Sequence, residues 1–579
     1  MVLRKIRNAK VCLENSSIYD AYYKSPIDEN LIYFESRNGR DFTGNIFRII
    51  EEVSTGEYGD FKIHVYATPS VKSKIIRFRR KYNLKIDRIL TTEKEATISL
   101  EKAKYVFTDS GIQTKYVKKD GQIFTNTWHG TPLKLMGSDN VSEITALGHI
   151  QHSFLSADYL IYPNEYMADK MTKAYMVDKI FPGRILFEGY PRNSIFFNTE
   201  HREALKDKLE LKDKEIFVYM PTFRGVLSDM DDVKQRDDVE DYLSQIDLRL
   251  TDNQVLFAKL HAYNESQIDF TKFSHIKAFP GDFEIYEIVN LADVLITDYS
   301  SVFFDFANTS RKIIIFNYDE EDYLSYRGFY FPLEELPFPK VQDVDDLIRE
   351  LNSPKDYDDS DFIEMFCTYD NPDACQNICR HIFKSEKTSK EVSIDNKKPN
   401  ILIYAGPLED NAITDSLINL LENADLKSSN FFITFNPWDK NIKENHESIF
   451  SRFPKDVEFL PFKSNLIPTL PEKIDYDKYF KAKNSMTLPD SLSKLFERSY
   501  EKQYGSVEFE FLLDYYGLNP DVALIFANSN QKKIVWAHED ISDNDKLGEI
   551  YGMFDLIVVD DDGLKEKMAK ITNTNVEIW

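Results

Sequence analysis

Residues 297–301 (TDYSS) form a polar cluster suited to binding an anion, because they separate two apolar runs. Residues 294–296 before the cluster are all apolar, and the apolar side chains of residues 302–307 after it have helical spacing. This pattern predicts a buried parallel strand, a turn and a helix. The hydroxyls of Ser300 and Ser301 would then lie where backbone N–H groups and the positive end of the helix dipole meet, which favours phosphate. The alternative is that a side chain of this turn only caps the helix.

A histidine next to a glycine follows the strand predicted at residues 123–128. Ligands of open parallel sheets collect beyond the carboxyl ends of the strands, so His129 would be exposed there and would titrate near neutrality. It is therefore a candidate general base. Taken alone, the same pattern also fits a histidine that only forms hydrogen bonds within a turn.

Two clusters of cations follow strands of a second predicted series. Arg224 comes shortly after an apolar strand, and its guanidinium suits bidentate recognition of phosphate, although a surface ion pair is equally compatible. Lys259 and His261 close the next strand and add an ammonium and a second imidazole at the same edge. Together with residues 297–301, they give the second sheet one rim of phosphate-binding groups, and the first sheet offers His129.

Strands alternate with helical stretches along the chain, which predicts the α/β fold class, with parallel sheets covered by helices on both faces. A chain of 579 residues is too long for one core. We expect residues 185–187 to begin the second sheet and residues 523–526 to form a strand of a third. The predicted division is a first Rossmann-like domain at 1–180, a second at 181–385, a polar linker at 386–400 and a further α/β domain at 401–579.

The composition narrows the class of protein. The formal net charge of −25 disfavours nucleic acid as a partner, and 42% hydrophobic residues is an ordinary value for a globular chain. The four cysteines are too few for a disulfide framework and indicate a reducing compartment, and no Cys/His pair completes a zinc site with Cys375 and Cys379. No apolar run approaches the roughly 18 residues that span a bilayer. We therefore expect a cytoplasmic protein without a metal.

One basic segment stands out in this acidic chain. Residues 71–85 (VKSKIIRFRRKYNLK) contain seven Lys or Arg and no acid, interleaved with apolar side chains. Such a segment could contact anionic lipid headgroups on the inner face of the cell membrane, or a polyanionic acceptor. The alternative is a solvated helix face that is balanced by acids elsewhere.

Five motifs, in order, resemble the CDP-glycerol glycerophosphotransferase family, which includes teichoic-acid polymerases and primases and their capsule relatives. The motifs are WHGTPLK at 128–134, PTFR at 221–224, KLH at 259–261, LITDYSSVFFDFA at 295–307 and RGFYF at 327–331. The resemblance implies a GT-B-like pair of Rossmann-like domains that face each other across a cleft, with the acceptor on the first and the nucleotide on the second. It implies no cofactor. Residues 401–579 lie outside the resemblance, and their start resembles the amino-terminal half of a glycosyltransferase.

The resemblance also implies roles for individual residues. His129 would deprotonate an acceptor hydroxyl, which attacks the β-phosphorus of CDP-glycerol while CMP leaves, and His261 would be the second catalytic residue. The implied substrate-binding residues are Trp128, Gly130, Thr131, Pro132, Pro221, Thr222, Arg224, Lys259, Thr297, Asp298, Ser300, Ser301, Asp305 and Arg327. The donor could also be CDP-ribitol or a nucleoside-diphosphate sugar, and a non-catalytic polymer-binding subunit stays open as an alternative.

Overall fold

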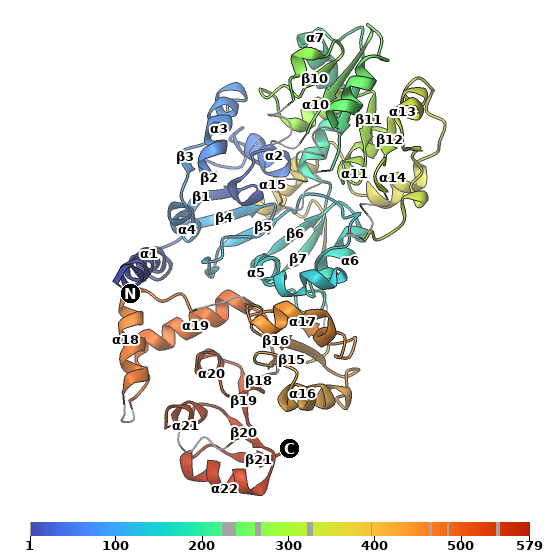
Figure 1. The fold of residues 1–579 in the computed structure, drawn as a ribbon. Coiled ribbons are helices and arrows are strands. Elements are labelled where there is room, and N and C mark those ends of the chain that lie inside the picture. The colour runs from blue at the N-terminus through green and yellow to red at the C-terminus, as the bar shows by residue number, and fades with distance from the viewer. Residues whose placement is uncertain are drawn as a thin grey trace.

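The computed structural model describes residues 2–222, 239–260, 268–320, 323, 328–394, 397–462, 466–482, 486–539 and 545–579. They form three α/β units in succession, each built on one mostly parallel sheet (Figure 1). In each unit the strands that follow one another along the chain lie in the order third, second, first, fourth, fifth, sixth. This is the order of a doubly wound Rossmann-like sheet, so the predicted α/β fold class is confirmed.

The first sheet has eight strands in the order β14-β7-β6-β5-β4-β1-β2-β3. Helices α2, α3 and α15 cover one face, and helices α4, α5 and α6 cover the other. The strands are β1 Asp28–Glu35, β2 Lys62–Tyr66, β3 Arg88–Leu90, β4 Ala103–Thr108, β5 Ile123–Asn126, β6 Tyr159–Tyr162, β7 Arg184–Phe187 and β14 Lys390–Ser393. The helices are α1 Val2–Lys24, α2 Gly44–Val53, α3 Pro69–Lys81, α4 Glu93–Leu100, α5 Gly148–Ser156, α6 Glu165–Ala174 and α15 Ala374–Lys384.

Two segments of this sheet differ from the prediction. Residues 185–187 were expected to begin the second sheet, but they lie in β7 and pair in parallel with β6 of the first. Residues 390–393, inside the predicted linker, form β14 and pair antiparallel with β7. An edge strand whose side chains are half-exposed or exposed has the polar composition of a linker, which is why composition alone missed it.

The second sheet has six strands in the order β10-β9-β8-β11-β12-β13 between two apolar layers. Its strands are β8 Glu215–Met220, β9 Gln254–Ala258, β10 Ile276–Ala278, β11 Val294–Thr297, β12 Lys312–Phe316 and β13 Lys340–Val341. Among its helices are α7 Thr199–Lys208, α10 Ile285–Leu291, α11 Val302–Phe306, α13 Val344–Leu351 and α14 Ser360–Phe366. The short 3-10 segment η4, Pro191–Phe197, connects this unit to the first sheet.

The third sheet has seven strands in the order β17-β16-β15-β18-β19-β20-β21. Its strands are β15 Asn400–Tyr404, β16 Asn430–Thr434, β17 Glu458–Phe459, β18 Phe511–Asp514, β19 Lys532–Ala537, β20 Leu556–Val559 and β21 Val576–Ile578. Its helices include α16 Ala412–Glu422, α17 Lys440–Phe450, α18 Leu470–Lys481, α19 Asp490–Tyr504, α20 Pro520–Ala527, α21 Asp545–Tyr551 and α22 Asp562–Ile571.

The strand predicted at residues 523–526 was wrong, because these residues lie in helix α20. A short run of apolar side chains has no periodicity that separates a buried helix from a buried strand. The local start signals favour the helix: Pro520 occupies its first turn, and the Asn519 side chain accepts hydrogen bonds from two backbone N–H groups of that turn.

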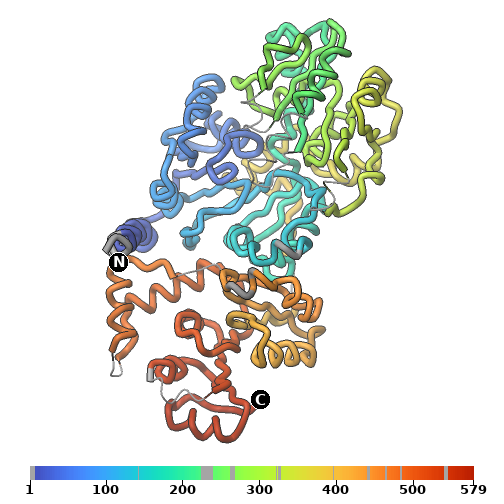
Figure 2. The backbone as a smooth tube through the Cα atoms, viewed as in Figure 1, coloured from blue at the N-terminus to red at the C-terminus, as the bar shows by residue number. Residues whose placement is uncertain are grey.

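The third unit packs directly against the first, and one continuous apolar core contains residues of both. Helix α1 lies beside α18, and α5 lies beside α19 (Figure 2). The Gln151 side chain donates to the Phe459 carbonyl at 2.9 Å, and the Tyr22 hydroxyl donates to the Glu501 carboxylate at 2.9 Å. Residues on α5 therefore face the first sheet on one side and the third unit on the other.

Candidate active site

The carboxyl ends of the first two sheets approach each other at Gly130 and Ser301. A Cβ atom placed on Gly130 would lie 2.5 Å from the Ser301 hydroxyl oxygen, closer than any real contact, and the φ of Gly130 is +155°. Only glycine fits both constraints. The WHGTP and TDYSS motifs, separated by more than 160 residues in sequence, are thus brought together, as the prediction of facing rims required.

His129 has the hydrogen bond that a general base needs. Its Nδ1 lies 2.6 Å from the backbone carbonyl oxygen of Asp109. A carbonyl only accepts, so Nδ1 carries the proton and donates it, and the lone pair lies on Nε2. Among the residues that the structure describes, Nε2 makes no hydrogen bond. Burial, followed by the guanidinium groups of Arg37 and Arg192, lowers the pKa of His129 well below its usual range, so the imidazole is neutral at pH 7. The expectation that His129 titrates near neutrality was therefore wrong, because the sequence did not show this burial or the two nearby cations.

The loop that carries His129 is strained and firmly held. Trp128 has a φ of +50°, which a bulky side chain rarely adopts. Its backbone N–H donates to the Asn126 side chain at 2.8 Å, and its carbonyl accepts from the Asn45 side chain at 3.3 Å. The indole is buried and stacks on the His129 ring with centroids 4.4 Å apart. Trp128, predicted to bind substrate, therefore orients the imidazole.

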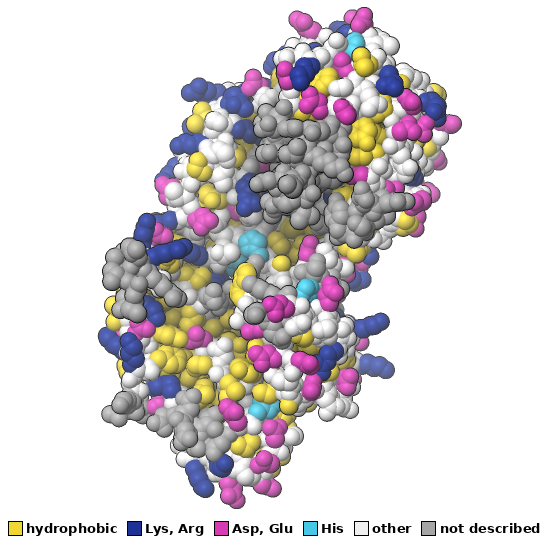
Figure 3. All heavy atoms as spheres, in the orientation of Figure 1, with side chains coloured by type: hydrophobic (Ala, Val, Ile, Leu, Met, Phe, Trp, Pro, Cys, Tyr) yellow, Lys and Arg dark blue, Asp and Glu magenta, His cyan; other side chains and the backbone are white. Residues whose placement is uncertain are grey.

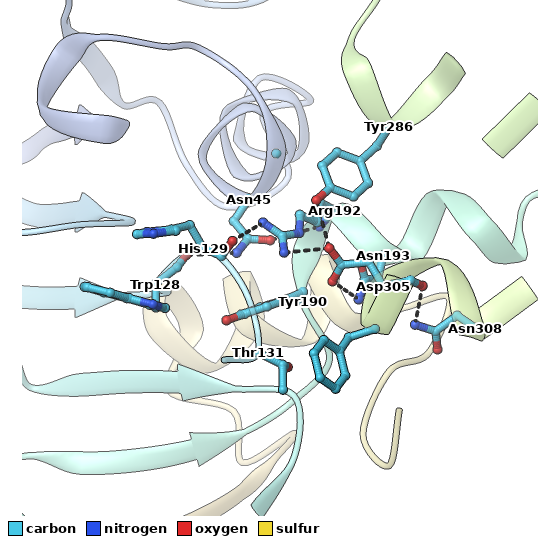
Figure 4. Close-up of polar contacts among 12 residues, drawn as sticks. Asn45, Trp128, His129, Thr131, Tyr190, Arg192, Asn193, Tyr286, Asp305 and Asn308 are labelled. Atoms are coloured by element: carbon cyan, nitrogen blue, oxygen red, sulfur yellow. Dashed lines mark hydrogen bonds and ion pairs between the residues drawn. The ribbon is translucent and has the colours of Figure 1, made fainter. Parts of the chain in front are cut away.

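Arg192, which the sequence interpretation missed, joins this loop to the second sheet (Figure 4). One guanidinium nitrogen donates to the His129 carbonyl at 3.0 Å, and the other pairs with the Asp305 carboxylate at 2.7 Å. The two side chains are only 5% and 3% exposed. Arg192 follows the carboxyl end of β7 within a Pro-Arg-Asn sequence, so its place after a strand was the available signal.

Asp305 was predicted to bind substrate, but the protein itself occupies its carboxylate. Besides Arg192, the Tyr286 hydroxyl donates to it at 2.9 Å and the Asn193 amide donates at 3.2 Å. Asp305 lies on α11 and its partner Arg192 on η4, so these contacts fix the second sheet against the connection from the first. The contacts of Asp305 are those of a positioning residue.

Thr131 and Pro132 also contact protein. The Thr131 hydroxyl is buried, accepts from the Asn164 amide at 3.2 Å and lies 4.0 Å from the Met167 sulfur. The Pro132 carbonyl accepts from the Tyr166 hydroxyl at 3.0 Å. Both residues were predicted to bind substrate; in the structure they hold the loop against helix α6, which carries Tyr166 and Met167.

In both sheets an aspartate bridges the point where the strand order reverses, which is where doubly wound sheets bind their ligands. After β4, Asp109 accepts from the Arg37 backbone N–H at 2.7 Å. After β11, both carboxylate oxygens of Asp298 accept from the Thr222 backbone N–H, at 2.8 and 2.9 Å. Asp298 therefore ties the loop after β8 to the loop after β11.

The TDYSS turn has the predicted strand, turn and helix, with two refinements. The Thr297 hydroxyl donates to the Met220 carbonyl at 2.7 Å and so links the neighbouring strand ends. Ser301 is the N-cap residue of α11, but its side chain accepts no capping hydrogen bond. Helix α11 has only five residues, so its dipole is weak. The half-exposed hydroxyls of Ser300 and Ser301 are consequently the main donors that this turn offers.

The remaining predicted residues divide into two groups. Pro221, Thr222 and Lys259 lie at the carboxyl ends of the adjacent strands β8 and β9 and are half-exposed, and the Lys259 backbone N–H donates to the Tyr219 carbonyl. Arg224, His261 and Arg327 lie outside the described residues.

Comparison with known proteins decides the family. The sequence model described as CDP-Glycerol:Poly(glycerophosphate) glycerophosphotransferase matches residues 17–384. The chain belongs to this family. It is 28% identical over 416 residues to the teichoic acid poly(glycerol phosphate) polymerase of Bacillus subtilis (strain 168), covering 66% of this chain and 52% of that protein. It is 29% identical over 417 residues to the teichoic acid glycerol-phosphate transferase of Staphylococcus aureus, covering 66% of this chain and 100% of that protein.

A solved structure supports the fold of this chain. The wall teichoic acid polymerase TagF superposes with a TM-score of 0.54 at 24% identity, over 66% of this chain and 96% of that chain. The GT-B-like pair of Rossmann-like units is therefore confirmed. The family match ends at residue 384, so the third sheet lies beyond it. The chain spans about half the length of the B. subtilis polymerase that it matches.

Two further findings concern the whole described chain. Within the described ranges, no group of three or more His, Cys, Asp or Glu side chains is placed to hold a metal ion. None of the helices in those ranges combines the length and apolar character required to cross a membrane.

Proposed function

We propose that this glycerophosphotransferase transfers glycerol phosphate from CDP-glycerol to a hydroxyl of a lipid-linked or polymeric acceptor in teichoic acid or capsule biosynthesis, with release of CMP. The observation that carries the proposal is the state of His129. Its Nδ1–H donates to the Asp109 carbonyl, so the neutral ring offers Nε2 to a proton, next to the point where the two sheets meet.

In the proposed reaction the acceptor hydroxyl gives its proton to Nε2 of His129, and its oxygen forms a bond to the β-phosphorus of the donor. The bond between that phosphorus and the bridging oxygen breaks, and CMP leaves with the electron pair. The Asp109 carbonyl, which already accepts a hydrogen bond from Nδ1–H, stabilises the imidazolium that forms. A positioned general base of this kind contributes about 10²–10⁴-fold to the rate.

The leaving CMP gains negative charge, and phosphoryl transfer depends on groups placed to neutralise it. We assign this role to Lys259 and to the hydroxyls of Ser300 and Ser301, which lie at strand ends of the second sheet. Arg224 and His261, as members of the PTFR and KLH motifs, complete the proposed set. The second Rossmann-like unit is thus the proposed donor side, and the first is the acceptor side.

CDP-ribitol is the second candidate donor, because the teichoic acid poly(ribitol-phosphate) polymerase of Bacillus spizizenii is also similar to this chain, at 26% identity over 352 residues. The test measures the nucleotide that each donor releases with a lipid-linked acceptor: CMP from CDP-glycerol or CDP-ribitol, and UDP from a UDP-sugar. We expect CMP from CDP-glycerol at the highest kcat/KM. Release from CDP-ribitol alone would reassign the donor, and release from none of them would favour a non-catalytic polymer-binding subunit.

We also propose that helix α3 holds the protein at an anionic membrane surface on the cytoplasmic side, with 71–85 as the contact segment. Lys and Arg side chains gather over α3 (Figure 3). Part of this charge is used within the protein, since Arg77 pairs with Asp282 at 2.9 Å. Arg79 and Arg80 are exposed and form no ion pair within the described part of the chain. They are the proposed lipid contacts.

A further inference from the structure

A cavity of about 260 Å³ lies between the acceptor-side unit and the third unit. Its walls come from α5, which carries His149 and His152, and from α19, which carries Lys502 and Gln503. The exposed indole of Trp438, from the loop after β16, contributes a further wall. The cavity therefore exists only because the third unit packs against the first.

Lys502 is a buried cation that faces this cavity. Lys502 is only 8% exposed. Among the described residues, no carboxylate lies within ion-pair distance of its ammonium. The Glu472 carboxylate, on the adjacent helix α18, is bound by both guanidinium nitrogens of Arg498 at 2.9 and 2.8 Å. Burial, with the charges of Arg498 and Lys115, lowers the pKa of Lys502 to about 7.

A buried charge without a counterion is costly, and an anion that enters the cavity would offset that cost. His152 is buried in the cavity wall, and backbone groups of Lys502 and Gln113 form hydrogen bonds with its ring. The cavity thus combines a buried cation with a lining that contains no carboxylate among the described residues.

The cavity lies beside the loop that positions the candidate base. Asp109, whose carbonyl holds His129, is two residues before Gly111. A Cβ atom on Gly111 would lie 2.3 Å from Nε2 of His149, so the glycine allows the cavity wall to pack on this loop. The adjacent Ser110 carbonyl accepts from the Ser153 hydroxyl of α5 at 3.2 Å. An anion in the cavity would therefore sit on the acceptor side of the reaction centre.

We propose that this cavity binds a phosphodiester group of the acceptor polymer, with the Lys502 ammonium as the charged donor. The inference rests on the proposed function, because it assigns the acceptor as a phosphate-linked polymer. It gives the third unit a role: it supplies the cation that holds the polymer while its end reaches His129.

The test compares Lys502→Met with Lys494→Met, a substitution on the same helix at an exposed lysine that pairs with Asp490. Each full-length variant is assayed with a long poly(glycerol phosphate) acceptor and with a lipid-linked acceptor bearing one glycerol phosphate. Loss of one charge-assisted contact predicts that Lys502→Met raises KM for the long acceptor about tenfold at unchanged kcat. The KM for the short acceptor stays as in wild type, and Lys494→Met matches wild type with both.

A KM for the long acceptor within about twofold of wild type would overturn the inference, as would an equal rise with both acceptors. Methionine removes the charge and keeps the chain length, so we expect normal folding, checked by thermal unfolding. Direct titration of poly(glycerol phosphate) into each protein by calorimetry separates the two proposals. If wild type releases no CMP but binds the polymer about tenfold more tightly than Lys502→Met does, the proposed function fails and the anion site stands. If wild type releases CMP but wild type and Lys502→Met bind the polymer equally tightly, the proposed function stands and the anion site fails.

Discussion

The buried ion pair between Arg192 and Asp305 is the contact between the first two units whose loss we expect to cost most. The nitrogen–oxygen distance is 2.7 Å, and both side chains are almost fully buried. Asp305→Asn removes the negative charge, keeps the shape of the side chain and leaves the Arg192 guanidinium buried without a counterion. Removing one partner of such a pair costs about 3–5 kcal/mol of unfolding free energy.

A matched control exists in the same region of the molecule. Arg77 and Asp282 also pair across the first two units, at 2.9 Å, but their side chains are 48% and 71% exposed. Solvent screens an exposed pair, so Asp282→Asn costs about 0–1 kcal/mol. Both are Arg–Asp ion pairs and they differ in burial, so the comparison of the two variants isolates the effect of desolvation.

The assay is urea unfolding of wild type and both variants, followed by circular dichroism, with CMP release measured on the same preparations. Asp305→Asn shifts the unfolding midpoint several-fold more than Asp282→Asn does. It also lowers kcat, because the released Arg192 no longer fixes the carbonyl of His129. Equal midpoints for the two variants would refute the reasoning about burial.

Three further predictions concern the base, the inter-sheet contact and the basic helix. The pKa of His129 lies well below the usual value of about 6.5. We therefore expect kcat/KM to stay constant as the pH falls through about 6.5 and to drop only in more acid solution, where the base is protonated. A midpoint at or above about 6.5 in the kcat/KM profile would contradict this. Gly130→Ala drives a methyl group against the Ser301 side chain, in the turn before α11, and lowers kcat/KM by about 10²-fold. Gly281→Ala, at a site with open space, leaves kcat/KM unchanged, and equal activities of the two variants would exclude the close approach. The double substitution of Arg79 and Arg80 by alanine weakens sedimentation with anionic liposomes and not with neutral ones, and unchanged sedimentation would remove the membrane proposal.

The sequence was most informative where short buried strands end in turn residues. The strand at Val294–Thr297 was predicted because an all-apolar run meets a polar cluster, and the structure has it at that place. Prediction failed where polarity or periodicity was uninformative. Residues 390–393 look like a linker because they form a half-exposed edge, and residues 523–526 look like a strand because four buried helical residues show no period.

The site was predictable in part for a related reason. His129 and the hydroxyls of Ser300 and Ser301 follow strand ends, and strand-end position is visible in the sequence. Long-range pairing is not visible. Nothing in the neighbourhood of Asp305 indicates that Arg192, more than a hundred residues earlier, occupies its carboxylate. Lys502 likewise has the sequence context of a surface lysine, and only the packing of α19 on α5 buries it.

The central claim is that His129 is the base of a glycerophosphate transfer, and one measurement tests it most directly. It is the single-turnover rate of CMP release from CDP-glycerol by wild type and His129→Ala, with saturating acceptor and with donor binding measured separately. The account predicts that His129→Ala binds CDP-glycerol as wild type does and releases CMP about 10²–10⁴-fold more slowly. A rate within a few-fold of wild type at equal donor binding would contradict it.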